Sequence, residues 1–144
     1  MGRPRGFEES DAVNAAAAVF RQRGYASTSV DHLVAATGVH RGSLYGVFGS
    51  KHGLFLRVLD ALDAADADHI ARLDVVLIGL LELAPADPRV RTRIATLLTA
   101  HGITDVQLGD RLLSRAGLRN GPERTAVPER TAVPKRTTRS KEQE

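Results

Sequence analysis

Six side chains between residues 29 and 51 have the chemistry needed to bind a nucleic acid. They are Ser29, His40, Arg41, Ser43, Tyr45 and Lys51. Hydroxyl groups suit phosphate oxygens, whereas an arginine fork also suits the edges of bases. A lysine at the start of a helix, where Lys51 stands, opposes the helix dipole, so an anion is a better partner for it than the helix. These residue types predict an interface for DNA.

Two short helices joined by a tight turn are expected to position these side chains, over residues 29–48. Ser29 is a suitable N-cap for the first helix, in which apolar residues recur at helical spacing. Gly38 is expected to end that helix. The second helix places its polar residues opposite an apolar face that contains Leu44 and Phe48. A helix, a glycine turn and a second helix with a basic outer face predict a helix-turn-helix.

The remaining pattern predicts an all-α chain. Ala, Leu and Val dominate the apolar residues, and helical spacing recurs between glycine and proline breaks. We expect further helices over residues 8–23, 51 to about 67, 69–83, 89 to about 100, and 105–116. Asp87 is expected to cap the helix that Pro88 begins.

The apolar residues of these helices supply a core. Phe20, Leu33, Leu44 and Phe48 are expected to be buried in it. Five leucines in the later helices allow two interpretations: they line an apolar pocket, or they pack as plain core. These are Leu73, Leu77, Leu80, Leu97 and Leu112. The sequence leaves both interpretations open.

Charge and composition divide the chain into three parts. Residues 1–57 hold seven basic against four acidic residues, and we expect a helix-turn-helix domain there. Residues 58–120 are slightly acidic and are expected to form a short helical regulatory domain. Residues 121–144 repeat the motif P-E-R-T-A-V and carry few apolar groups, so we expect a disordered basic tail. A basic domain beside an acidic one fits a nucleic-acid binder with a second function.

The sequence gives little support for an enzyme, a metal-binding protein or a membrane protein. The five histidines form no metal-ligand motif, and the chain has neither a nucleophile elbow nor a phosphate loop. We therefore expect no enzyme activity, no cofactor and no metal. The aspartates at 60, 63, 66 and 68 are expected to form a solvated helix face. The longest apolar run, residues 75–81, is too short to span a membrane, and a cytoplasmic location is the default expectation.

The pattern from Gly24 to Phe55 is similar to a known family. It reads G-Y-A-S-T-S-V-D-H-L-V-A-A-T-G-V-H-R-G-S-L-Y-G-V-F-G-S-K-H-G-L-F and resembles the DNA-binding domain of the TetR/AcrR transcriptional regulators. The resemblance implies a three-helix DNA-binding domain, with a fourth helix that links it to a domain for ligand sensing and dimerisation. It also implies a double-stranded DNA operator as the partner.

The resemblance assigns roles to the candidate residues. Ser29, Tyr45 and Lys51 match positions that usually hold the phosphate backbone. Arg41 and Ser43 match positions that often face bases. His40 stands where the family commonly has a serine or threonine cap, and Gly46 where it often has a histidine or another polar aromatic residue. The family's last two helices, which form a four-helix dimer interface, have no counterpart before residue 121, so the expected regulatory domain is truncated.

Two functions follow as hypotheses. The first is a repressor that binds a palindromic operator as a homodimer and is released by a small apolar effector. The alternative is a truncated regulator that binds DNA weakly and acts as a helical interaction protein.

Overall fold

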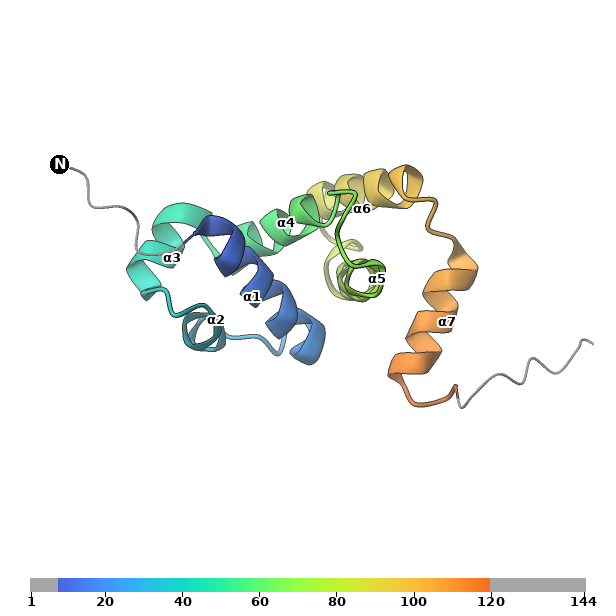
Figure 1. The fold of residues 1–144 in the computed structure, drawn as a ribbon, viewed down its shortest axis with the longest axis horizontal. Coiled ribbons are helices and arrows are strands. Elements are labelled where there is room, and N and C mark those ends of the chain that lie inside the picture. Colours follow the sequence, from blue (N-terminus) through green and yellow to red (C-terminus); the bar gives the residue numbers. More distant parts are fainter. Residues whose placement is uncertain (1–7, 120–144) are drawn as a thin grey trace, which may run out of the picture.

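The computed structural model describes residues 8–119, and over this range the chain is all-helical, as predicted (Figure 1). The elements are α1 (Glu9–Arg23), α2 (Val30–Thr37), α3 (Arg41–Phe48), α4 (Lys51–Ala61), α5 (His69–Ile78), the π-helical η1 (Gly79–Leu83), α6 (Pro88–Ala100) and α7 (Asp105–Arg115). The expected basic tail lies outside the described residues. None of the described helices is both long enough and apolar enough to cross a bilayer.

Most of these helices have a polar side chain at the N-cap. Ser50 and Thr104 each accept a hydrogen bond from a backbone N–H in the first turn of α4 and α7, respectively. Asp68 does so for α5, and Asp87 for α6, where Pro88 holds the first position as expected. Each cap satisfies an N–H group that has no partner within its helix. Local sequence therefore explains where these helices start.

Helix α4 is shorter than predicted. It ends at Ala61, six residues before the expected end, and turns follow as far as Ala67. The reason is Arg72 on α5, whose buried guanidinium donates to the carbonyl oxygens of Leu62 and Ala64 at 2.8 and 2.9 Å. These carbonyls bond to Arg72 instead of to a further turn of helix, so the chain reverses and starts α5.

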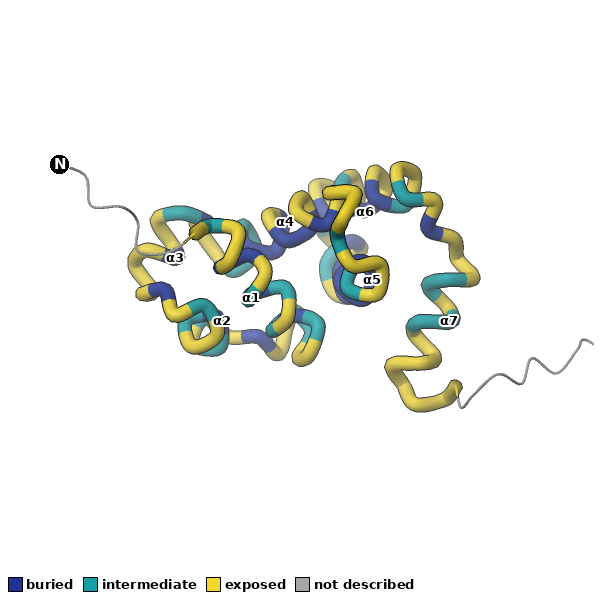
Figure 2. Tube along the Cα trace, in the orientation of Figure 1, coloured by how far each residue is buried: buried dark blue, intermediate teal, exposed yellow. Residues whose placement is uncertain are grey.

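Three aromatic rings mark the centre of the core. Phe20 and Phe55 are fully buried, with ring centroids 5.2 Å apart and planes nearly perpendicular. Tyr25 packs against both rings, at 5.8 and 5.3 Å. These residues come from α1, α4 and the connection before α2, so the core joins the helix-turn-helix to the fourth helix. Figure 2 shows buried residues concentrated along α4 and α5, whereas α7 is largely exposed.

The later leucines divide between core and surface. Leu73, Leu77 and Leu97 are buried, as a plain core requires. Leu112 instead leaves 42% of its surface exposed on α7. The five leucines therefore do not all line one enclosed pocket.

The acidic residues near the α4–α5 turn have structural partners. Asp60 pairs with Arg93 at 2.8 Å, and Asp63 lies 3.1 Å from a ring nitrogen of His101. Asp68 caps α5. In the part of the chain that the structure describes, no group of three or more acidic or histidine side chains is arranged to hold a metal ion.

Candidate nucleic-acid interface

Helix α3 presents its polar residues to solvent and buries its apolar ones. Leu44 and Phe48 are buried, as predicted, and fix the helix against the rest of the domain. His40, Arg41, Ser43 and Tyr45 are all exposed. Tyr45 retains 42% of its surface, so it is not a core residue. The four candidate residues of this helix are therefore available to a ligand.

Arg41 is already paired within the protein. Its guanidinium forms an ion pair with Asp31 on α2, and both side chains are more than half exposed. A pair this exposed contributes little to stability, because water competes for both charges. The contact holds the guanidinium beside α2 and supplies a carboxylate with which any anionic ligand of Arg41 must compete. Asp31 and Arg41 stand ten residues apart on separate helices, so the sequence alone did not indicate this pair.

Ser29 caps α2 through a reciprocal pair of hydrogen bonds. Its Oγ accepts from the backbone N–H of His32, and the backbone N–H of Ser29 donates to His32 Nδ1, both at 3.1 Å. The prediction that Ser29 is the N-cap is confirmed. The role of His32 was missed, because a glutamate or glutamine usually holds the third position of such a capping box.

Lys51 has partners inside the protein. Its Nζ donates to the carbonyl oxygens of Tyr25 and Thr28 at 3.1 and 3.0 Å and lies 4.2 Å from the centre of the Tyr25 ring. Its place at a helix N-terminus predicts an anion as its partner, but the two carbonyl oxygens already explain the position of this lysine. The phosphate contact stays a prediction that depends on the third N–H of the ammonium.

Glu82 holds the same connection from the other side. Its carboxylate, on η1, accepts hydrogen bonds from the backbone N–H groups of Tyr25 and Ala26 at 3.1 and 2.7 Å. Gly24 has φ +82°, and a Cβ there would lie 2.7 Å from Glu82 Oε1. Glycine therefore serves both the left-handed turn and the close approach of this carboxylate. The loop that leads to Ser29 is thus clamped between α4 and η1.

Two glycines leave the outer face of α3 open. Gly42 and Gly46 are exposed, lie four residues apart on one face, and have free space where a Cβ would stand. Gly53 on α4 differs, because a Cβ there would collide with the carbonyl oxygen of Phe48. The bare backbone at Gly42 and Gly46 lets a ligand approach α3 closely, whereas Gly53 lets α4 pack against the end of α3.

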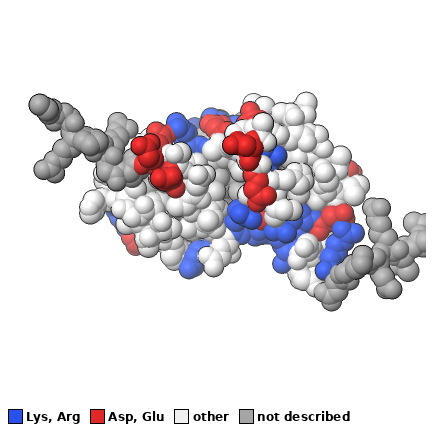
Figure 3. Space-filling view, in the orientation of Figure 1, with Lys and Arg blue, Asp and Glu red and all other residues white. Residues whose placement is uncertain are grey.

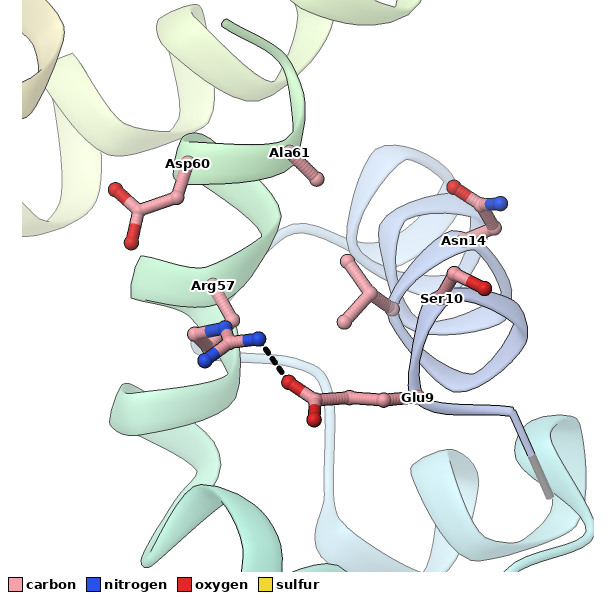
Figure 4. Close-up of a pocket in the computed structure, with 7 residues that line it drawn as sticks. Glu9, Ser10, Asn14, Arg57, Asp60 and Ala61 are labelled. Atoms are coloured by element: carbon pink, nitrogen blue, oxygen red, sulfur yellow. Dashed lines mark hydrogen bonds and ion pairs between the residues drawn. The ribbon is translucent and has the colours of Figure 1, made fainter. Parts of the chain in front are cut away.

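A groove between α1 and α4 lies beside this domain (Figure 4). It has a volume of about 400 Å³ and is crossed by an ion pair between Glu9 and Arg57. These charges come from two helices of the helix-turn-helix domain and neutralise each other. Asp60, which also lines the groove, pairs with Arg93 of α6, so the groove offers no unpaired charge to a ligand.

Helix α7 is joined to α1 and α5 by a cluster of charges. Asp74 on α5 is only 2% exposed and lies within 3.1 Å of Arg21, Arg111 and Arg115. Burial alone would raise the pKa of Asp74, but hydrogen bonds from the arginines outweigh it and hold the pKa below its ordinary value. The sequence did not indicate this cluster, because its members are distant along the chain.

Comparisons with known proteins agree with this geometry. Residues 12–58 match the family described as bacterial regulatory proteins, tetR family. Over 70 residues the chain is 41% identical to the HTH-type transcriptional repressor BdcR of Escherichia coli (strain K12), which covers 49% of this chain and 36% of BdcR. It is 44% identical over 73 residues to the HTH-type transcriptional repressor ComR of the same organism, covering 50% of this chain and 35% of ComR.

A Bacillus relative shows the same pattern. The uncharacterized HTH-type transcriptional regulator YezE of Bacillus subtilis (strain 168) is 35% identical over 75 residues, which is 51% of this chain and 39% of YezE. The chain thus matches little more than a third of the length of each relative. The match to the family model includes α2, α3 and most of α4. Residues 12–58 of this chain are therefore similar to the tetR family of bacterial regulatory proteins.

Proposed function

We propose that this chain is a sequence-specific DNA-binding transcriptional regulator that acts as a repressor. The observation that carries the proposal is the exposed polar face of α3, held on a capped helix-turn-helix. Two of its relatives are named as transcriptional repressors, which supports the same function here.

In this proposal α3 enters the major groove. Arg41 and Ser43 contact base edges, and Gly46 lets the backbone approach the bases. The other candidates hold phosphates: Ser29 and Tyr45 through their hydroxyls, and Lys51 through the N–H that its two carbonyl partners leave over. Arg41 must exchange Asp31 for its DNA contact, because the same guanidinium makes both.

Two copies would bind a palindromic operator, with their α3 helices roughly 34 Å apart in successive major grooves. A small effector would alter this spacing through α4, which packs against α1, α3 and α6. The clamp of Glu82 on Tyr25 and Ala26 supports such coupling, because it links η1 directly to the loop before α2.

A second function is favoured by the surface of α7. Val106, Leu112 and Leu113 are each more than 40% exposed, and Leu118 beyond the helix is 73% exposed. Exposed apolar side chains on one amphipathic helix suit contact with another protein. The interaction protein thus remains the alternative function, with α7 as its surface.

Selection of bound duplexes from a random DNA pool tests the first function. We expect a palindromic consensus, and sedimentation with that DNA should show two copies per duplex. Arg41→Ala should weaken consensus binding by about tenfold or more, since a good base contact is worth about 1–3 kcal/mol. Arg89→Ala, an exposed arginine on α6, is the matched control.

Three results would contradict the proposal. Recovery of random sequences would exclude sequence-specific binding. A monomer on DNA would exclude the dimer. If Arg41→Ala and the unmodified chain distinguish the consensus from random DNA equally well, Arg41 does not contact bases. A chain that binds no DNA but captures a protein through α7 would favour the alternative function.

A further inference from the structure

A hollow lies between α1 and the turn that joins α4 to α5. Its volume is about 240 Å³, and small apolar side chains, including Val13, Ala17, Ala61 and Leu62, form much of its wall. Arg21 and Asp68 also line it. Pockets for drug-sized ligands measure roughly 300–1,000 Å³, so this one suits a smaller molecule with an apolar body.

Counted together with the Asp74 cluster that Arg21 joins, the charges at the hollow leave a surplus of one positive charge. Arg21 belongs to the cluster in which three arginines share the carboxylate of Asp74. The pKa of Arg111 is raised first by the hydrogen bonds that it donates to Asp74, and further by the nearby charge of Asp68. Three guanidiniums thus face two carboxylates. Figure 3 shows the resulting blue area on the side where α5 and α7 lie.

The hydrogen bonds of the cluster show which arginine is free to take a ligand. Arg111 is bound to Asp74 through two bonds, at 2.6 and 2.8 Å. Arg115 contacts both Asp74 and the carbonyl oxygen of Arg21. Arg21 reaches only one oxygen of Asp74, at 3.1 Å, and its side chain is 32% exposed. Among the described contacts, Arg21 therefore keeps the most unused N–H groups, and it lines the hollow.

Asp68 does not cancel this attraction. Its two oxygens accept hydrogen bonds from the backbone N–H groups of Ile70 and Ala71, which cap α5. Its charge is thus shared with the positive end of a helix. The groove of Figure 4 adjoins the hollow, since both are lined by Val13 and Asn14, but its charged residues already have partners: Glu9 pairs with Arg57, and Asp60 with Arg93.

We infer that the hollow binds a small organic monocarboxylate. The apolar part of the ligand packs against the alanines of α1 and the α4–α5 turn, and its carboxylate pairs with Arg21. A single carboxylate matches the surplus charge, and an arginine fork binds it in a bidentate manner. Binding in itself does not depend on the proposed function. The consequence for DNA does, because a ligand held against α1 acts on the helix that packs against α2.

Calorimetry and thermal shift on the full chain test the inference, with benzoate and hexanoate as probes. We expect saturable binding of at least one of them, and no comparable binding of the neutral benzamide or hexanamide. Arg21→Gln should weaken binding by about tenfold or more, because a hydrogen bond to a charged group is worth about 1.5–3 kcal/mol. Ala18→Leu, at an exposed position that lines the hollow, should abolish it.

Two matched variants control for fold and charge. Arg23→Gln removes another arginine from the last turn of α1, and Ala95→Leu enlarges an exposed alanine on α6; both should bind as the unmodified chain does. Absence of binding, equal binding of acid and amide, or unchanged binding by folded Ala18→Leu would overturn the inference. DNA binding is measured separately by gel shift, so failure of the ligand and failure of the regulator are distinguishable.

Discussion

The ion pair between Arg41 and Asp31 gives the sharpest prediction, because it sets stability against DNA binding. Asp31→Asn keeps the size of the side chain and removes its charge. Arg41 is then free, and one negative charge beside the proposed DNA-binding face is gone. We therefore expect tighter DNA binding. Asp31 also lies in the first turn of α2, where a negative charge is favourable. Its loss should lower stability by about 0.3–1 kcal/mol.

The gain in affinity follows from two contributions. Release of Arg41 from an exposed pair returns about 0.2–1 kcal/mol. Repulsion between a carboxylate and a phosphate roughly 10 Å away costs about 0.4 kcal/mol in water. Together they amount to about 0.6–1.4 kcal/mol, which is roughly a three- to tenfold increase in affinity at low salt.

Fluorescence anisotropy on a labelled consensus duplex measures this effect, in a double-mutant cycle with Arg41→Ala. In the Arg41→Ala background, Asp31→Asn should raise affinity by only about twofold, since the repulsion alone remains. Asp60→Asn, which breaks another exposed pair with an arginine, should leave DNA affinity unchanged. An equal gain with and without Arg41, or a loss of affinity in Asp31→Asn, would refute the reasoning.

Three further predictions concern the domain and its attachments. Gly46→Ala should stabilise the protein by up to about 1 kcal/mol in urea denaturation, because its Cβ meets free space in a helix, whereas Gly49→Ala should destabilise it, because φ is +75° there; the same sign for both would contradict this. Glu82→Ala should cost about 1 kcal/mol and speed hydrogen exchange at the Tyr25 and Ala26 amides, and unchanged exchange would exclude the clamp. Because the folded pKa of Asp74 lies below 3.8, its contribution is present at higher pH and is lost as the pH falls through the folded value. Below about pH 4, the free energy of unfolding should therefore fall less steeply with decreasing pH in Asp74→Asn than in the unmodified chain. Parallel pH curves for the two proteins would contradict this.

The amino-acid sequence by itself determined the local structure of this protein. Ser29, Ser50, Asp87 and Gly38 mark helix ends, because capping depends on residues within one turn of each other. The apolar spacing of Leu44 and Phe48 correctly oriented α3. The DNA-binding roles of its exposed residues are still predictions, because they depend on a partner that the sequence does not contain.

Tertiary structure decided the partners of the charged residues. Hydrogen bonds from Arg72 to the chain after Ala61 end α4 early. Lys51 donates to carbonyl oxygens of the loop before α2, so its position does not require an anion. Arg21 and Asp74 are 53 residues apart, and Glu82 is 57 residues from Tyr25. Helical periodicity tells which side of a helix is buried but not which helix covers it, so such long-range pairs appear only once the chain has folded.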